Sequence, residues 1–306
     1  MQKFLFILLI ALTTNTIFSQ SIRPIDLVRQ HQGALTAQDF ISSTQTRDQS
    51  IDLEKLSDYT LLNIDVSGLL TLRSEFLDAI SLKMPISTSE SWDLQLVQVD
   101  IFSDDFTLVE EPSGKRVNID RGTHYRGIVK GYDNSLVSIS MYNDEIGGFI
   151  SHPRYDGNFV VGKRKSKDKS KSQHIIYQDT DMVIEKGRIC DTSDDGLEYT
   201  QADLAALEEG RALSDCVRLL LEVDFNMYQE LGGTASAANN YMNTLFNGVS
   251  TIYAGENINT VFSQSYYWSS TSPYTGTSAS AKLSTYQSNR NNFNGDFAQL
   301  LTNINF

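Results

Sequence analysis

The chain has 306 residues, a net charge of −13, 40% hydrophobic residues and two cysteines. The hydrophobic content supports a sizeable core and excludes wholesale disorder, and two cysteines exclude a disulfide-dense miniprotein or a cysteine-based zinc module. The acidic balance argues against nucleic acid as a partner, because phosphate binding needs a basic face.

The first twenty residues predict a secretory signal peptide (1–20). Lys3 supplies the positive start, Phe4 to Leu12 form an uncharged apolar run, and a short polar stretch ends near Ser19. Nine apolar residues are too few to cross about 30 Å of hydrocarbon, and no later run is long enough either. We therefore expect a secreted mature chain without a membrane span, in a compartment where a cysteine pair can oxidise.

Charge density divides the mature sequence. Residues Ser21 to Ala212 include 21 basic and 32 acidic side chains, whereas Leu213 to Phe306 include three basic and six acidic ones and are rich in Ser, Thr, Asn, Tyr and Gly. Such a shift in composition predicts a domain boundary near the polar stretch Asp191–Arg211. We expect a first unit at 21–190, a linker at 191–212 and a second unit at 213–306.

The first unit shows the pattern of β-structure. The run Trp92 to Phe102 alternates, and both of its faces are largely apolar, which is typical of a strand inside a sandwich. Three short strands are expected after it, at His124–Lys130, Leu136–Tyr142 and Glu145–Ser151, with turn residues between them. This spacing predicts a small antiparallel sandwich or roll.

The second unit alternates strands with helices. The expected order is strand Cys216–Asp224, helix Ser236–Tyr253, strand Ile258–Tyr267, helix Ser278–Arg290 and strand Phe297–Leu301. The first helix has apolar residues at helical spacing, Thr234 or Ser236 can cap its start, and Gly255 is placed to end it. A strand, a helix and a second strand in this order predict a right-handed crossover in a mostly parallel sheet.

Three stretches of the second unit resemble the N-terminal half of the catalytic domain of reprolysin/adamalysin-like metzincins, a family of zinc endopeptidases. They are CVRLLLEVDFNMY (216–228), NTLFNGVSTIYAGENI (243–258) and GDFAQLLT (295–302). In that family they correspond to the first strand, the first long helix with the second strand, and a strand with an Asp-x-Ala-Gln-Leu-Leu pattern. The last match is the most specific.

The first unit resembles the propeptide of the same family. The matching stretch is HYRGIVKGYDNSLVSISMYNDEIGGFI (124–150), which has a His-Tyr-x-Gly strand, a Ser-x-Val strand and a glycine-rich return. The resemblance implies a multidomain α+β protein in which a β-rich propeptide sandwich precedes the N-terminal α/β half of a metzincin-like catalytic domain. It also implies a zymogen of a secreted zinc-dependent metalloendopeptidase that acts on protein or peptide substrates.

The zinc site of that family is not encoded in these residues. The family needs His-Glu-x-x-His on a helix, where two histidines bind zinc and the glutamate is the general base for attack by zinc-bound water. The four histidines, His31, His124, His152 and His174, do not form this pattern, and none lies in the second unit. We expect the chain as given to be inactive, either because the zinc helix follows Phe306 or because the protein is an inactive relative.

A function of another class stays open. A non-catalytic secreted binding or adhesion module would use the Ser-, Thr- and Tyr-rich stretch Ser263–Ser280 as an exposed surface. A reading frame that continues to a His-Glu-x-x-His helix favours the peptidase, and a stop after Phe306 favours the binding module.

The resemblance also implies a calcium site. Many relatives bind calcium through a glutamate early in the first strand and the aspartate that begins the third. Asp296 matches the aspartate, but Arg218 stands where the glutamate would be, and a cation cannot ligate calcium, whose ligands are oxygens. The competing interpretation makes Asp296 a turn or cap residue before a strand.

The two cysteines allow three interpretations. Propeptides of the family often carry a cysteine that holds the zinc, and Cys190 lies at a suitable place, although its context RICDTSD is not the usual Cys-Gly. The second interpretation is a disulfide between Cys190 and Cys216, which would contribute roughly 3 kcal/mol by closing a loop of that size. Unpaired thiols are the third.

Overall fold

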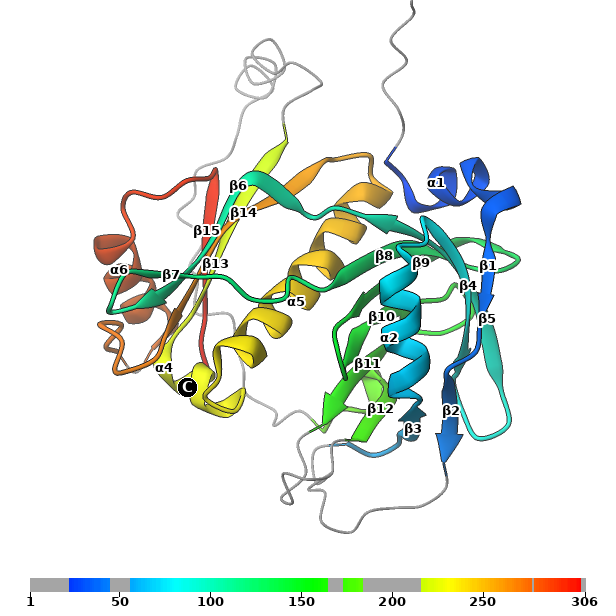
Figure 1. Cartoon of the computed structure of the whole chain (residues 1–306). Coiled ribbons are helices and arrows are strands. Elements are labelled where there is room, and N and C mark those ends of the chain that lie inside the picture. Colours follow the sequence, from blue (N-terminus) through cyan, green and yellow to red (C-terminus); the bar gives the residue numbers. More distant parts are fainter. Residues whose placement is uncertain (1–21, 45–55, 165–172, 184–215, 277, 304–306) are drawn as a thin grey trace, which may run out of the picture.

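A computed structural model describes residues 22–44, 56–164, 173–183, 216–276 and 278–303. These residues form a mixed α/β structure with two large sheets (Figure 1). The ten-stranded sheet belongs to the first unit, and the five-stranded sheet contains the strands of the second unit.

The ten-stranded sheet is antiparallel except for one parallel pair, β1 with β4. From edge to edge it consists of β1 (Thr36–Gln38), β4 (Ala79–Pro85), β5 (Ser91–Val99), β8 (Thr123–Val129), β9 (Tyr132–Met141), β10 (Ile146–Ser151), β11 (Asn158–Arg164), β12 (Gln173–Gln178), β3 (Thr60–Ile64) and β2 (Ile41–Thr44). Strands β2 and β4 also contact each other, so the sheet curls back on itself.

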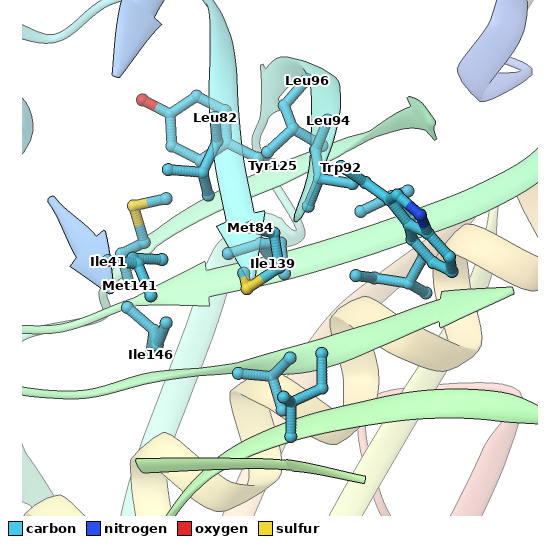
Figure 2. Close-up of a cluster of buried hydrophobic side chains, with 14 of the residues drawn as sticks. Ile41, Leu82, Met84, Trp92, Leu94, Leu96, Tyr125, Ile139, Met141 and Ile146 are labelled. Atoms are coloured by element: carbon cyan, nitrogen blue, oxygen red, sulfur yellow. The ribbon is translucent and has the colours of Figure 1, made fainter. Parts of the chain in front are cut away.

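The curled sheet encloses an apolar core together with helix α2 (Val66–Glu75). Leu69 and Leu72 from the helix belong to the same buried cluster as the strand residues. Leu82, Leu94 and Leu96 are among the strand residues of this cluster (Figure 2). Helix α1 (Pro24–Gln30) lies outside, against β5 and β8. The first unit therefore has a core of its own, formed by a helix and one curled, mostly antiparallel sheet, which is closer to the roll than to the sandwich of the two predicted forms.

The second sheet has the order β15 (Phe297–Leu301), β13 (Val217–Val223), β14 (Thr260–Trp268), β6 (Phe102–Glu111) and β7 (Lys115–Val117). The first four strands are parallel, and β7 returns antiparallel to β6. Its helices are α4 (Phe225–Glu230), α5 (Ala235–Gly255) and α6 (Ala279–Asn289), and short 3-10 turns occur at Gln32–Ala34 and Asp179–Asp181.

The crossover predicted for the second unit is confirmed. Helix α5 connects β13 to its parallel neighbour β14, and the Thr234 hydroxyl caps it by accepting a hydrogen bond from the Ala237 N–H at 3.2 Å. Gly255 is the last residue of the helix, and the left-handed backbone follows at Asn257 (φ 60°).

The run Trp92 to Phe102 is not one strand. It divides at Asp100, whose carboxylate accepts a hydrogen bond from the Phe102 N–H at 3.0 Å and turns the chain. Strand β5 stays in the first sheet, whereas β6 pairs with β14 in the second. The two predicted units therefore share a sheet.

Helix α5 lies between the two sheets (Figure 1). One face packs through Met242 and Phe246 on the apolar core of the second sheet, and the other covers β9 and β10 of the first sheet.

Candidate functional site

The face of α5 turned toward the first sheet is polar and buried. Asn239, Asn243 and Asn247 recur every four residues, which places them in one row along the helix, and each is at most 1% exposed. Ser250 and Thr251 continue this face and are fully buried. The spacing is visible in the sequence, but only the burial shows that the row is an interface.

Each asparagine reaches the first unit with its amide. Asn239 Nδ2 donates to the Asp120 carbonyl at 2.9 Å, and Asn243 Nδ2 donates to the Arg121 carbonyl at 3.1 Å. Asn247 Nδ2 donates to the hydroxyl of Ser140 at 3.2 Å. Side-chain amides of the second unit therefore bind backbone and hydroxyl groups of the first.

A buried arginine lies at the same interface. Arg126 is 5% exposed, and its Nη2 donates to Ser250 Oγ at 2.6 Å while its Nε donates to Asn247 Oδ1 at 3.4 Å. Its partners among the described residues are neutral, and burial lowers the pKa of Arg126 to about 10. A buried cation without an anion is costly, so this contact adds little net stability.

His124 occupies the first sheet directly beneath the helix. Its Nε2 lies 2.9 Å from the Arg121 carbonyl and its Nδ1 lies 2.9 Å from Ser140 Oγ. A carbonyl only accepts, so Nε2 carries the proton and Nδ1 accepts from the serine hydroxyl. Burial lowers the pKa of His124 to about 4, so the ring is neutral at pH 7.

Two polar atoms of this region have no hydrogen-bond partner among the described residues. They are Asn243 Oδ1 and Ser138 Oγ, both buried, and Ser138 is on the same face of β9 as Ser140. An interface with unpaired buried polar atoms gains less from being closed than a fully satisfied one.

A second polar cluster lies at the carboxyl ends of the parallel strands. Buried Glu222, in β13, accepts from Trp268 Nε1 at 2.6 Å and from Arg290 Nε at 2.8 Å, and it also accepts from the Tyr274 hydroxyl. This end of a parallel sheet is where α/β proteins bind ligands. Here the carboxylate is already occupied by donors of the chain itself, which indicates a structural role.

The neighbouring buried ion pair of Lys282 and Asp224 also has a structural role. Lys282 Nζ lies 2.9 Å from Asp224 Oδ2 and 3.0 Å from Thr302 Oγ1. The other carboxylate oxygen of Asp224 caps α4 by accepting from the Met227 N–H at 2.8 Å. The pair ties α6 and the end of β15 to the end of β13.

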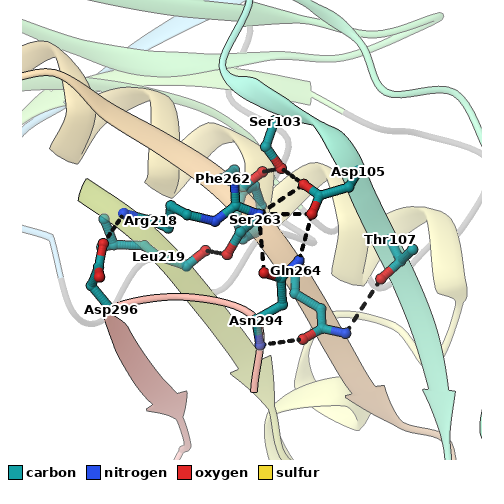
Figure 3. Close-up of polar contacts among 10 residues, drawn as sticks. All are labelled: Ser103, Asp105, Thr107, Arg218, Leu219, Phe262, Ser263, Gln264, Asn294 and Asp296. Atoms are coloured by element: carbon teal, nitrogen blue, oxygen red, sulfur yellow. Dashed lines mark hydrogen bonds and ion pairs between the residues drawn. The ribbon is translucent and has the colours of Figure 1, made fainter. Parts of the chain in front are cut away.

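Asp296 joins β15 to β13 (Figure 3). Its carboxylate accepts from the Arg218 N–H at 2.8 Å, and its own N–H donates to the Arg218 carbonyl at 2.8 Å. The Arg218 guanidinium turns to Asp105 at 2.7 Å and holds the pKa of that carboxyl well below its usual range. The structure thus gives Asp296 a place at the start of a strand, and a role as calcium ligand stays a prediction.

The predicted cysteine pairing stays open. Cys216 immediately precedes β13, and its Sγ lies 2.7 Å from Asn259 Nδ2. Cys190 lies outside the described residues, so neither the disulfide nor the zinc-switch interpretation is tested.

The other three histidines lie apart. His31 Nδ1 is 2.8 Å from the Leu27 carbonyl, His152 stacks on Trp92 at 4.5 Å, and His174 Nε2 accepts from the Ile146 N–H at 3.0 Å. Within the described ranges, no group of three or more His, Cys, Asp or Glu side chains is arranged to hold a metal ion. These residues do not fit the zinc of a metallopeptidase.

A groove of about 920 Å³ lies between α5 and strands β10 and β11. Phe149, Val160, Leu245 and Val249 are among its apolar lining residues, and the ion pair of Asp144 with Lys163 lies at one end. Sequence periodicity gave no sign of it, because the groove exists only where a helix meets a sheet formed elsewhere in the chain.

The stretch Ser263–Ser280, proposed as the surface of a binding module, is buried only in part. Its first part belongs to β14, a central strand of the second sheet, where Ser263 and Ser265 are fully buried. Tyr274 is also buried. The described residues from Ser269 to Ser280, apart from Tyr274, are exposed or half-buried, so a binding role for this part of the stretch stays a prediction.

Known proteins give no further assignment: no protein-family model and no curated protein sequence matches the chain. In the part of the chain that the structure describes, none of the helices combines the length and the apolar character needed to cross a membrane.

Proposed function

We propose that the chain is the precursor of a secreted zinc-dependent metalloendopeptidase and comprises its propeptide and the first part of its catalytic domain. The observation that carries the proposal is the arrangement of the three stretches that resemble metzincins. The first supplies β13, the second supplies most of the crossover helix α5, and the third supplies β15, parallel to β13 from Leu219 opposite Phe297 to Val223 opposite Leu301. Stretches up to 80 residues apart in the sequence thus form one continuous piece of sheet.

The contact between the units also supports a propeptide. A propeptide has to bind a folded partner and then leave it, and such interfaces are more polar than domain cores. Asparagine, serine and arginine side chains make a row of hydrogen bonds between α5 and the first unit.

Zinc chemistry itself is not assigned to any residue of this chain. The described residues do not fit a zinc site, and the sequence has no His-Glu-x-x-His. In the proposed enzyme these residues are scaffold: β13, β14 and β15 form the sheet, and α5 covers one of its faces.

The decisive test is the reading frame after codon 306, followed by expression of the extended precursor. The proposal expects a downstream His-Glu-x-x-His helix, one bound zinc per chain, and cleavage of casein once the first unit has been removed. The chain 1–306 alone is expected to show neither activity nor stoichiometric zinc. A stop codon at this point, or activity in the 306-residue chain, contradicts the proposal.

A secreted binding module is the second candidate, and the groove beside α5 is the observation that favours it. Gly162 lines this groove, and a Cβ added there meets no atom within 4 Å. Gly162→Leu is therefore expected to fill the groove without disturbing the fold and to reduce the fluorescence of a bound anilinonaphthalene sulfonate dye. Unchanged fluorescence would argue against a usable binding groove.

A further inference from the structure

The two units are interlocked at two places. Strand β6 of the first unit extends the second sheet, paired with β14 from Gln264 opposite Thr107 to Trp268 opposite Glu111. Phe106, from the same strand, packs on Phe262 with ring centroids 5.1 Å apart. In return, α5 of the second unit covers the first sheet. These contacts do not depend on the chain being continuous between Val183 and Cys216.

His124 lies where the two contacts meet, and it shares both of its hydrogen-bond partners with α5. The Arg121 carbonyl accepts hydrogen bonds from His124 Nε2 at 2.9 Å and from Asn243 Nδ2 at 3.1 Å. Ser140 Oγ lies 2.9 Å from His124 Nδ1 and accepts a hydrogen bond from Asn247 Nδ2 at 3.2 Å. The ring of Phe102, from β6, packs edge-on against the imidazole with centroids 5.6 Å apart.

The surroundings disfavour a charged imidazole. Burial is the largest cause of its lowered pKa, Arg126 on β8 and Arg73 on α2 add repulsion, and Asp120 partly offsets both. Helix α5 presents the amides of Asn243 and Asn247 here, β9 presents Ser140, and Tyr142 follows directly after β9. A cavity of about 370 Å³ reaches the ring, and its charged lining residues besides His124 are Asp78, Asp100 and Arg121.

We propose that the first unit, once the chain is cut between Val183 and Cys216, stays bound as a separate subunit at neutral pH and is released when acid protonates His124. The cut is hydrolysis of one peptide bond, which consumes one water and leaves a carboxylate and an ammonium group. The inference rests on the proposed function, because a precursor is what sheds a propeptide. Its test, however, requires no peptidase activity.

The difference in the pKa of His124 between the bound and released states sets the pH dependence of the dissociation constant. The pKa of His124 is about 4 in the closed interface, mainly because of burial, and the proposal expects it to rise toward its ordinary value of 6.5 when α5 leaves. Release therefore takes up a proton between about pH 4 and pH 6.5, and a full return of the pKa to 6.5 raises the dissociation constant about 30-fold from pH 7.5 to pH 5.

The experiment inserts a recognition site for a sequence-specific protease between Asp195 and Gly196 of the full chain. Mass spectrometry confirms the cut, and size-exclusion chromatography with dilution series then measures association of the two pieces at pH 7.5 and pH 5. One complex at pH 7.5 that dissociates about 30-fold more readily at pH 5 supports the proposal. Pieces that separate at pH 7.5 overturn it.

Two variants show whether His124 is responsible. His124→Gln is expected to reduce the pH effect to less than about threefold. His174→Gln is the matched control, because His174 is also buried with a pKa near 4 but binds within the first unit, so it should keep the 30-fold effect. The same pH effect in His124→Gln as in the parent chain contradicts the proposal.

Nuclear magnetic resonance of the parent chain gives a readout without substitution. The His124 ring should titrate near pH 4 in the cut complex and near pH 6.5 in the released unit, and an unchanged midpoint overturns the proposal. Failure of the proposed function would look different, since a stop codon after position 306 would leave all of these results intact.

Discussion

Both faces of helix α5 are buried, but the face on its own sheet is apolar and the face on the first sheet is polar. Toward its own sheet, Phe246 stacks on Phe262 with ring centroids 4.7 Å apart. Toward the first sheet, its neighbour Asn247 is equally buried but held by hydrogen bonds. Exposing an aromatic ring to water is costly, whereas an exposed amide exchanges its partners for water at small net cost. Helix α5 thus meets its own sheet through apolar packing and the first sheet through hydrogen bonds, whereas β6 joins the two units through a shared apolar core.

The largest effect is expected from the apolar face. Phe246→Ala should lower the free energy of unfolding by about 3–5 kcal/mol, because it removes a buried ring and leaves a cavity. Urea unfolding followed by circular dichroism measures the change. A loss below about 1 kcal/mol would mean that this face is not a core.

The second prediction concerns the stability of the chain at acid pH, which depends on the buried histidines His124 and His174. The pKa of both His124 and His174 is lowered to about 4 from 6.5, so the folded chain binds fewer protons than the unfolded one between these values. Stability is therefore complete above pH 6.5 and falls as the pH drops toward 4, by roughly 2 kcal/mol for each histidine at pH 5. Urea unfolding at pH 7.5 and pH 5 measures the difference, and His124→Gln should remove about half of it.

A smaller loss is expected at the residue next to Phe246. Asn247→Ala should cost about 1–3 kcal/mol, because it leaves buried hydrogen-bonding groups of the first sheet without a partner. Ile252→Ala, at an exposed position of the same helix, is the control and should stay within about 0.5 kcal/mol. If Asn247→Ala costs as much as Phe246→Ala, the contrast between the two faces fails.

The smallest effect is expected for Arg126→Met. The variant loses two hydrogen bonds to neutral groups but no longer buries a charge, so the free energy of unfolding should change by less than about 1 kcal/mol. A loss above about 3 kcal/mol in urea unfolding would show that the guanidinium has an anionic partner.

The second unit could be predicted closely from its residues. The expected strand Phe297–Leu301 agrees with β15 at both ends, and the helix expected at Ser236–Tyr253 lies within α5. Alternation, helical spacing and the Thr234 cap are local properties, so they can be recognised without knowing what lies around them.

The first unit was harder to predict. Helix α2 was missed because it has Gly68 near its start and little amphipathic pattern, although Asp65 supplies the N-cap through the Ser67 N–H at 3.0 Å. The passage of β6 into the other sheet was missed as well. Asp104, Asp105, Glu110 and Glu111 interrupt the apolar pattern of β6, and only its pairing with β14 shows that it is a strand of the second sheet.

The sequence by itself determined the apolar periodicity of the strands and helices of the second unit, the N-cap of α5 and the crossover between β13 and β14. It also determined that these residues contain no zinc motif. Tertiary structure decided how the two units share a sheet, that the asparagine row of α5 is an interface, and that His124 lies beneath it. The physical reason is distance along the chain: His124 and Asn247 are separated by more than a hundred residues, and the chemistry of either one depends on the other being there.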